Sequence, residues 1–205
     1  MDTNKIILKW YDREKRDLPW REANKNIIDV YKVWISEIML QQTTVNVVIP
    51  YFEKFIKKFP NIYVLAESKI EDVLALWAGL GYYSRARNLH KCAKNIIKNN
   101  NGVFPSQKVI LLKLPGIGDY TASAICAIAY NQCEIAIDVN VKRVISRINN
   151  KHNTNNLQIK KLSQNILLCD RPGDINEAIM DLGSTICKAK EPICLICPLN
   201  KICKT

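Results

Sequence analysis

The sequence predicts an all-α protein, and three observations support this fold class. Apolar residues recur with the spacing of one helix face along most of the chain. Glycine and proline number only 7 and 8 among 205 residues, so few positions interrupt a helix. No convincing run of alternating polar and apolar residues marks a half-buried strand. We therefore expect about ten helices with short connections.

Eight segments carry the helical pattern, and polar or glycine-containing stretches such as "NNKHNTNNLQ" separate them. They span residues 30–43, 45–59, 70–81, 84–100, 120–130, 139–150, 156–168 and 175–189. We expect two helical lobes with a central cleft. Residues 25–132 would form one lobe, and residues 1–24 with 133–205 would form a discontinuous second lobe.

The charge balance favours a polyanionic partner. Lysine and arginine number 30 against 19 acidic residues, for a formal net charge of +11. Cationic side chains that neutralise phosphates release counterions, although a lysine- and asparagine-rich proteome would produce the same bias. The start "MDTNKIILKW" lacks a signal peptide and no stretch has the length of a membrane span, so we expect a cytoplasmic or nucleoid-associated protein without a membrane partner. In a reducing compartment, eight cysteines indicate metal or redox chemistry more than disulfides.

A glycine hairpin, "LPGIGDYTA", precedes an apolar helix. Leu114 and Pro115 end the preceding segment, and Gly116 and Gly118 permit a close approach of the backbone to a ligand. The unpaired amides of the following helix can receive an anion, so the hairpin is suited to gripping a DNA phosphate without reading sequence. An ordinary turn between two helices is the alternative.

Two acidic residues stand in apolar surroundings. Asp138 lies in "AIDVNVKRV", where it either caps the helix beginning at Val139 or faces positive charge that develops on a sugar. Glu37 lies in "WISEIMLQQT", and burial there would raise its pKa and keep it protonated. One neutral and one ionised carboxyl group is the arrangement that cleavage of a glycosidic bond needs.

These motifs together resemble the helix-hairpin-helix DNA glycosylase superfamily, and within it the catalytic half of the MutY-type adenine glycosylases. Endonuclease III and the mismatch thymine glycosylases share the hairpin, the aspartate and the cysteine spacing, whereas "LQQT" and "GLGYYSRAR" are more specific to the adenine branch. The matching blocks are "LPWR", "VWISEIMLQQT", "WAGLGYYSRARNLH", "LPGIGDYTASAI", "DVNVKRV", "MDLGSTIC" and the terminal cysteines. The resemblance places the helix-hairpin-helix at about residues 110–130.

The resemblance implies that the C-terminal loop binds one [4Fe–4S] cluster. The spacing Cys187-x6-Cys194-x2-Cys197-x5-Cys203 is the one with which this superfamily holds the cluster. A structural zinc site from the same four thiols is the alternative. The remaining cysteines lie on predicted helices and are interpreted as small core residues: Cys92, Cys126, Cys133 and Cys169.

The resemblance also implies catalytic roles. Glu37 would protonate the imidazole side of adenine as the general acid, and Asp138 would stabilise or transiently trap the oxocarbenium-like sugar. Asn140 would orient either Asp138 or the sugar through its amide. Tyr120 stands where bifunctional relatives carry a lysine, so no Schiff base can form there and we expect a monofunctional enzyme without strong lyase activity.

Further residues are implied in substrate binding. Gln42 and Tyr82 would wedge into the duplex and offset the cost of extruding the base. Trp20 and Arg21 would line the base pocket, and Glu177 would accept the exocyclic amine of adenine. The residues expected at the DNA backbone are Leu114, Gly116, Gly118 and Lys142.

The chain departs from the family pattern at three places. Val139 replaces the usual glycine after the aspartate, and the loop "EANKNIID" is longer than usual and lacks the common Asp-Pro. The chain stops two residues after Cys203, whereas MutY-type enzymes continue into a domain that inspects 8-oxoguanine. We expect either a minimal enzyme or part of a longer protein, with a weakened preference for adenine opposite 8-oxoguanine.

The sequence thus predicts a monomeric adenine DNA glycosylase acting on double-stranded DNA with a mispair. A mismatch thymine or uracil glycosylase is the alternative enzyme. A noncatalytic DNA-binding module with a redox-sensing cluster is the alternative from a different class, and it gives no reason for the acids and wedge residues to coexist.

Overall fold

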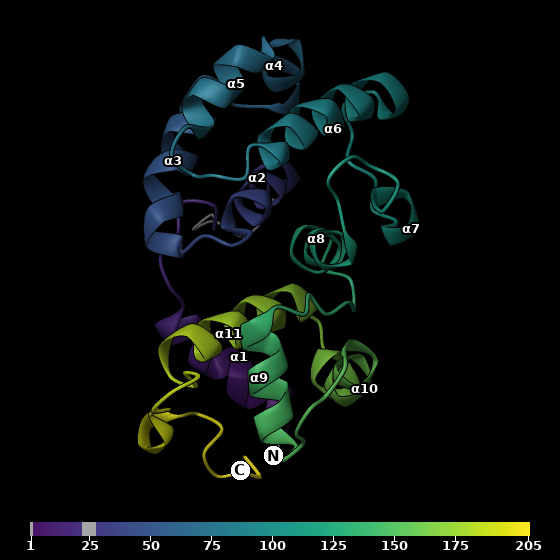
Figure 1. Cartoon of the computed structure of the whole chain (residues 1–205). Helices are drawn as coiled ribbons and strands as arrows, with labels where there is room; N and C mark the ends of the chain where they lie inside the picture. The colour runs from purple at the N-terminus through teal and green to yellow at the C-terminus, as the bar shows by residue number, and fades with distance from the viewer. Residues whose placement is uncertain (1, 22–27) are drawn as a thin grey trace. The chain divides into compact units, whose positions relative to one another are not determined.

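The computed structural model describes residues 2–21 and 28–205, and their regular structure is entirely helical (Figure 1). This confirms the predicted all-α class. The α-helices of the described residues are α1 (Thr3–Glu14), α2 (Val30–Leu40), α3 (Val45–Lys58), α4 (Ile62–Glu67), α5 (Ile70–Trp77), α6 (Ser84–Asn100), α7 (Lys108–Leu111), α8 (Asp119–Ala124), α9 (Val139–Ile148), α10 (Asn156–Leu167) and α11 (Pro172–Thr185). No helix among them is long and apolar enough to cross a membrane.

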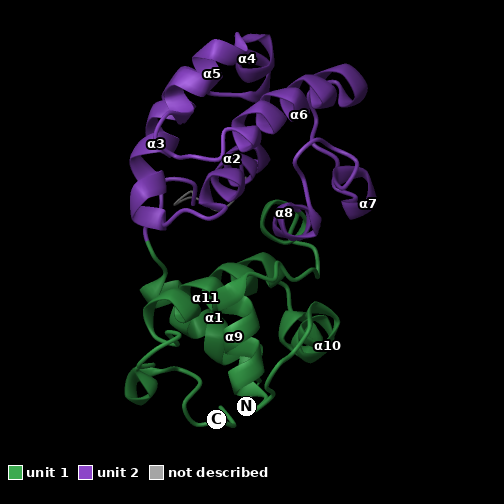
Figure 2. Cartoon of the chain, viewed as in Figure 1, with its two compact units in different colours: residues 1–16, 126–205 green, residues 17–125 purple. Residues whose placement is uncertain are grey.

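The chain divides into two compact units (Figure 2). One unit comprises residues 17–125, and the other comprises residues 1–16 with residues 126–205. The second unit is therefore discontinuous in sequence. Its boundaries fall at residues 16 and 126, whereas the sequence suggested residues 24 and 133. We refer to them below as the middle unit (17–125) and the terminal unit (1–16 and 126–205).

The middle unit is built around α2, which is apolar on nearly every face. Eight of its eleven residues are buried, most of them apolar. Helix α2 packs against α3, α6 and α8, and α6 also packs against α4 and α5. Asp29 begins α2 by accepting a hydrogen bond from the Tyr31 amide, and Asn61 begins α4 by accepting from the Tyr63 and Val64 amides. A helix buried all round forms the centre of a helical core.

The terminal unit is organised by the contact between α9 and α11. A Cβ atom added at Gly183 of α11 would lie 2.6 Å from the Asn140 Cβ and 3.3 Å from Val144 Cγ2 of α9. The absence of a side chain at Gly183 therefore lets the two helices approach closely. Helices α1 and α10 complete the core, which includes Ile7, Trp10 and Tyr11 from α1. The N-terminal helix α1 belongs to the same unit as the C-terminal part of the chain.

Two local features differ from the sequence-based expectations. The expected helix over 120–130 is α8 followed by a π-helix over Ile125–Ala129, a type of turn that simple periodicity does not distinguish. The placement of Cys133 and Cys169 in helices is wrong, although Cys169 does pack against the core of the terminal unit. Both lie in irregular segments, and Cys133 is exposed, whereas Cys92 and Cys126 are buried in helices.

Candidate active site

Glu37 lies on α2 with only 6% of its surface exposed. Its helix neighbours Ser36 and Ile38 are 1% and 3% exposed, so the carboxyl group is enclosed by the middle unit. An ionisable group in such surroundings is unusual, because burial away from water disfavours the charged form of a carboxyl group. The buried environment expected for Glu37 is therefore present.

Asp138 is the N-cap of α9 in the terminal unit. Its Oδ1 accepts a hydrogen bond of 2.6 Å from the Val141 amide, which confirms the capping interpretation. Its Oδ2 accepts a bond of 2.8 Å from the Asn140 Nδ2. Both carboxylate oxygens are thus oriented by α9 itself, and the cap favours an anion at the positive end of the helix. Val139, the unusual residue after the aspartate, points away from the core and is 76% exposed.

Arg143 extends this arrangement and was missed by the sequence analysis. Its Nη2 donates to Asn140 Oδ1 at 2.7 Å and to the Gly183 carbonyl at 2.6 Å, and its Nε donates to the Cys187 carbonyl at 2.8 Å. A continuous set of hydrogen bonds therefore leads from Asp138 to the first cysteine of the C-terminal loop. The available signal was the spacing of Arg143 and Arg147, which places both arginines on one face of a helix.

The four C-terminal cysteines lie in a loop held by Arg147. Its Nη1 donates to Cys187 Sγ at 3.4 Å and to the Lys188 carbonyl at 2.7 Å, and its own carbonyl accepts from Cys203 Sγ at 3.7 Å. In the part of the chain that the structure describes, no three His, Cys, Asp or Glu side chains form a group that could hold a metal ion. Cys187, Cys197 and Cys203 are partly buried, and Cys194 is exposed.

The donor set of this loop nevertheless fits an iron–sulfur cluster. Burial raises the pKa of the Cys197 thiol, and charge interactions with Cys187, Cys203 and Cys194 raise the pKa further. A [4Fe–4S] cluster takes one thiolate for each iron, which is the number that this loop supplies.

The two residues expected to wedge into DNA share an uncommon backbone conformation. Gln42 follows α2 with φ 58°, and Tyr82 precedes α6 with φ 47°. Positive φ is uncommon outside glycine, and such residues gather at functional sites. Both side chains are exposed, with Tyr82 60% exposed. Each stands at the surface of the middle unit in a short connection between two helices.

The hairpin connects α7 to α8. Leu114 is buried and accepts a hydrogen bond of 3.2 Å from the Ile117 amide, which closes the turn. Gly116 has φ 78°, and a Cβ atom there would lie 2.8 Å from the Asn88 Cβ of α6, so both conformation and space require glycine. Gly118 is the N-cap of α8, and Tyr120 is partly buried in the first turn of that helix. Lys142 belongs to the terminal unit and is exposed on α9.

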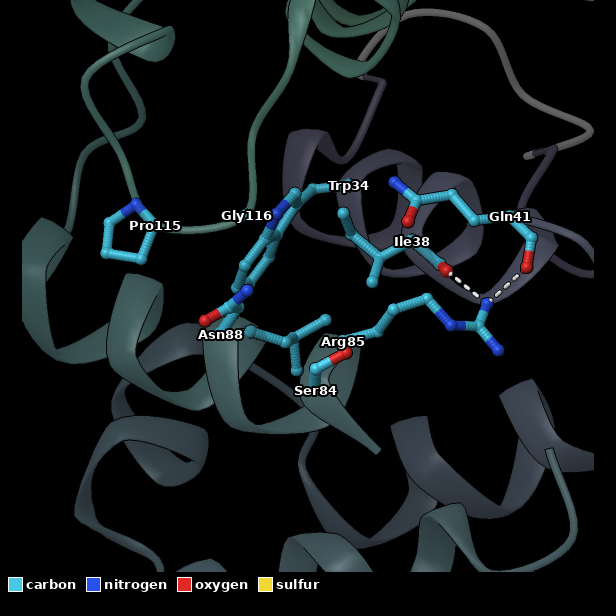
Figure 3. Close-up of a pocket in the computed structure, with 9 residues that line it drawn as sticks. Trp34, Ile38, Gln41, Ser84, Arg85, Asn88, Pro115 and Gly116 are labelled. Carbon is cyan, nitrogen blue, oxygen red and sulfur yellow. Dashed lines mark hydrogen bonds between the residues drawn. The ribbon is translucent and has the colours of Figure 1, made fainter. Parts of the chain in front are cut away.

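A pocket of about 60 Å³ adjoins the hairpin (Figure 3). Pro115 and Gly116 line it from the hairpin side, and Arg85 and Asn88 of α6 line it from the other. Its remaining lining residues are Trp34, Ile38, Gln41, Ser84 and Leu89. The pocket lies wholly within the middle unit.

The residues expected in the base pocket occupy both units. Trp20 is buried in the middle unit and contacts Phe52 edge-to-face, with ring centroids 5.3 Å apart, and Arg21 is half-buried beside it in sequence. Residues 22–27 of the loop that follows lie outside the described residues. Glu177 is on α11 of the terminal unit, where its Oε2 accepts a hydrogen bond of 2.6 Å from the Tyr11 hydroxyl.

The candidate residues thus form two groups. The middle unit holds the first group: Trp20, Arg21, Glu37, Gln42, Tyr82, Leu114, Gly116, Gly118 and Tyr120. The terminal unit holds the second group: Asp138, Asn140, Lys142, Glu177, Cys187, Cys194, Cys197 and Cys203. Within the terminal unit, hydrogen bonds join Asp138 and Asn140 directly and join them through Arg143 to Cys187.

Known proteins with similar sequences are adenine DNA glycosylases. The chain is 46% identical over 206 residues to the adenine DNA glycosylase of Buchnera aphidicola subsp. Acyrthosiphon pisum (strain APS). This match covers 98% of this chain and 58% of the relative. It is 41% identical over 208 residues to the Homo sapiens protein, covering 97% of this chain and 38% of the relative. The chain is 36% identical to the Mycobacterium tuberculosis (strain CDC 1551 / Oshkosh) protein, and the match covers 97% of this chain and 66% of the relative. The chain therefore spans only part of the length of these relatives.

Solved structures share the fold of this chain. A thermostable thymine-DNA glycosylase matches with a TM-score of 0.86 and 28% identity, covering 98% of this chain and 93% of that one. A non-covalent endonuclease III–DNA complex matches with a TM-score of 0.79 and 23% identity, covering 98% and 92%, which is a likeness of fold. The family pattern of the HhH-GPD superfamily base excision DNA repair proteins matches residues 35–168, which is more than half of the chain. The protein therefore belongs to the HhH-GPD superfamily of base excision DNA repair proteins.

Proposed function

We propose that this chain is the catalytic part of a monofunctional adenine DNA glycosylase. Its action is to extrude a mispaired adenine from double-stranded DNA and to hydrolyse the N-glycosidic bond. The observation that carries the proposal is the buried carboxyl group of Glu37, 6% exposed, in a chain up to 46% identical to adenine DNA glycosylases. Burial favours the neutral form of this carboxyl group, and a neutral acid suits proton transfer.

Glu37 is the general acid in this proposal. Its neutral carboxyl group donates a proton to the imidazole side of adenine, so that the electrons of the breaking bond leave with a neutral base. Burial favours the neutral form of a carboxylic acid, as this role requires. Proton transfer of this kind contributes about 10²–10⁴-fold in rate.

Asp138 stabilises the positive charge that develops on the sugar as the bond breaks. Its two oxygens are held by the Val141 amide and the Asn140 side chain, which support a carboxylate in one fixed orientation. Fixed charges stabilise a transition state without the cost of reorienting solvent. Addition of water to the sugar then leaves an abasic site. Tyr120, a phenol where a lysine would be required for a Schiff base, makes strand cleavage by β-elimination unfavourable.

The chain's specificity for adenine rests on Glu177 in this proposal. A carboxylate oxygen accepts the exocyclic amine of adenine, whereas thymine presents carbonyl oxygens and would leave that acceptor unpaired. Such an unpaired polar group costs about 1–3 kcal/mol. Trp20 and Arg21 complete the base pocket, and the glycine hairpin with Lys142 contacts the DNA backbone. Gln42 and Tyr82 fill the space that the extruded base leaves.

Cys187, Cys194, Cys197 and Cys203 would hold one [4Fe–4S] cluster. When bound, the cluster supplies a rigid crosslink that orders the C-terminal loop. Arg147 positions this loop from α9 through Cys187, Lys188 and the carbonyl of Ala189. Lys188 and Lys190 place positive charge in the same loop, which is suited to DNA phosphates. We propose that the chain acts as a monomer.

A panel of labelled duplexes tests the proposed function. Duplexes containing A:8-oxoguanine, A:G, T:G and U:G are incubated with the protein, and abasic sites are cleaved with alkali. We expect cuts at the adenine-containing mispairs and no cuts without alkali. Cuts only at T:G or U:G would assign the chain to the mismatch thymine or uracil glycosylases, an alternative supported by the 0.86 TM-score to a thymine-DNA glycosylase. Binding without any cleavage would indicate a noncatalytic module.

A further inference from the structure

The guanidinium group of Arg85 forms hydrogen bonds with two segments of the middle unit: the end of α2, and the connection between α5 and α6. Arg85 lies in the first turn of α6 and points toward the C-terminal end of α2 (Figure 3). It donates hydrogen bonds only to backbone carbonyls among the contacts described. From Nη1 the acceptors are Ile38 (2.9 Å), Met39 (3.0 Å) and Gln41 (2.6 Å), and from Nη2 they are Leu80 (3.2 Å) and Gly81 (3.3 Å).

Two of these acceptors directly precede Gln42 and Tyr82, which are exposed and have positive φ. Gln41 precedes Gln42, and Gly81 precedes Tyr82. The carbonyl of each preceding residue belongs to the same peptide unit as the amide of the following one. Hydrogen bonds to Gln41 and Gly81 therefore fix the peptide planes from which Gln42 and Tyr82 leave the backbone. The Arg85 guanidinium group thereby holds the Gln41–Gln42 and Gly81–Tyr82 peptide planes at the same time.

Aromatic contacts orient Arg85 further. Its guanidinium carbon lies 5.4 Å from the centre of the Trp77 ring and 5.6 Å from the centre of the Tyr82 ring, within the range of cation–π attraction. Trp77 Nε1 also donates to the Gly81 carbonyl at 3.1 Å. Arg85 thus contacts the Tyr82 side chain itself as well as the backbone before it. Trp77 is fully buried, so it forms a rigid support for this contact.

A lysine at this position could not make the same contacts. The guanidinium presents its donors in a fixed planar fork, whereas an ammonium group is a single point with three donors on a flexible stem. The backbone at Gln42 and Tyr82 is intrinsically unfavourable, because left-handed conformations of residues other than glycine persist only where surrounding contacts enforce them. Arg85 supplies such contacts at both places.

We propose that Arg85 is a positioning residue that fixes the spacing and direction of the two wedge residues, Gln42 and Tyr82. This inference rests on the proposed function, because it gives Arg85 a role in extruding the base. Arg85 acts through the two wedges and does not itself react with the substrate. Its loss should slow extrusion and excision while duplex binding, which depends mainly on phosphate contacts, changes little.

The first experiment compares Arg85→Lys with Arg87→Lys in the full chain. Arg87 is exposed two residues further along α6. The control variant therefore makes the same chemical change and leaves the hydrogen bonds of Arg85 intact. Emission from 2-aminopurine next to the mispaired adenine reports loss of base stacking, and fluorescence anisotropy gives duplex affinity. We expect Arg85→Lys to lose the emission rise and to slow single-turnover excision by about 10–100-fold, the scale of a misplaced catalytic geometry. Arg87→Lys should match the wild type in emission and rate.

The second experiment separates positioning from general support of the fold. Arg85→Lys is added to the double variant Gln42→Ala/Tyr82→Ala, which lacks both wedge side chains. If Arg85 acts through the wedges, this addition changes the excision rate by no more than about twofold, because contacts that work as one unit are not additive. A further loss equal to that seen in the wild-type background would overturn the proposal.

The remaining outcomes are also decisive. If Arg85→Lys matches Arg87→Lys in emission and rate, Arg85 does not position the wedges. If both Arg85→Lys and Arg85→Gln abolish the helical circular dichroism signal, Arg85 is a residue of the folding core and the proposal is wrong. A wild-type protein that neither raises 2-aminopurine emission nor cuts any duplex of the panel contradicts the proposed function instead.

Discussion

The hydroxyl group of Tyr11 donates a 2.6 Å hydrogen bond to Glu177 Oε2. Tyr11 is 1% exposed in the core of the terminal unit, so its ring is a fixed support for this contact. The residues are 166 positions apart, and the bond joins the first helix to α11. A carboxylate proposed to read adenine is therefore oriented by the N-terminal helix.

Tyr11→Phe should reduce adenine excision while it preserves the fold. The change removes the hydroxyl group alone, and a hydrogen bond to a charged group contributes about 1.5–3 kcal/mol. We expect the single-turnover rate on an A:G duplex to fall by about tenfold, since 1.4 kcal/mol corresponds to that factor. Tyr63→Phe is the control, because it removes a hydroxyl bonded to the Asn101 carbonyl at a site where the side chain is 51% exposed. Equal rates for the two variants would exclude this role for Tyr11.

Glu37→Gln should abolish excision without weakening DNA binding. The amide has the same shape as the carboxylic acid but cannot donate an acidic proton, and loss of a general acid costs about 10²–10⁴-fold. Glu67→Gln makes the same change at an exposed position of the middle unit and should leave the rate unchanged. Single-turnover kinetics and anisotropy on one duplex measure both quantities. Retention of activity in Glu37→Gln would contradict the proposed mechanism.

Asp138→Asn should keep the helix cap of α9 and remove the negative charge, so this variant tests the two contributions of Asp138 separately. Asparagine caps a helix about as well as aspartate, so the bond to the Val141 amide is replaced and thermal stability should change little. The negative charge is lost, and excision should fall to the background rate. Asp138→Ala removes the cap as well and should lower the free energy of unfolding by about 0.5–2 kcal/mol. A large loss of stability in Asp138→Asn would indicate that the carboxylate has a structural purpose.

Cys197→Ser should remove the cluster. We expect the wild-type protein to be yellow-brown, with a broad violet–blue absorption band and about four iron atoms per chain. Serine at position 197 should abolish the band and the iron, whereas Cys133→Ser changes an exposed thiol outside the four-cysteine loop and should retain both. Metal analysis and absorption spectra of the purified proteins provide the measurement. Zinc in place of iron would establish the alternative metal site.

Gly183→Ala should destabilise the terminal unit. The added methyl group would lie 2.6 Å from the Asn140 Cβ and 3.2 Å from its Cα, so α11 and α9 would have to move apart. Overpacking of this kind costs about 1–3 kcal/mol. Gly118→Ala is a control for stability alone, because nothing lies within 4 Å of a Cβ there. Thermal denaturation followed by circular dichroism compares the two, and equal melting temperatures would show that the α9–α11 contact is adaptable.

The sequence by itself determined the helical class, the hairpin and the candidate residues. The periodicity of segments such as 84–100 reports contacts between residues three and four apart, which a helix makes whatever surrounds it. The cysteine spacing is equally local. Glu37 could be predicted to be buried because Trp34, Ile38 and Met39 surround it on an amphipathic helix pattern. The wrong placement of Cys133 and Cys169 in helices shows the limit, since a short irregular segment can share the composition of its flanking helices.

Only the tertiary structure decided which distant groups meet. The acceptors of Arg85 at the end of α2 and at Gln41 lie 44–47 positions away, and Arg143 reaches Cys187 across 44 positions. Tyr11 reaches Glu177 only because α1 packs on α11. Side-chain periodicity specifies the face of a helix, but the partner of that face depends on the packing of whole helices and on the close approach that glycines such as Gly183 allow. For this reason the hydrogen bonds of Arg85 next to Gln42 and Tyr82, and the link from Asn140 through Arg143 to Cys187, were visible only in the folded chain.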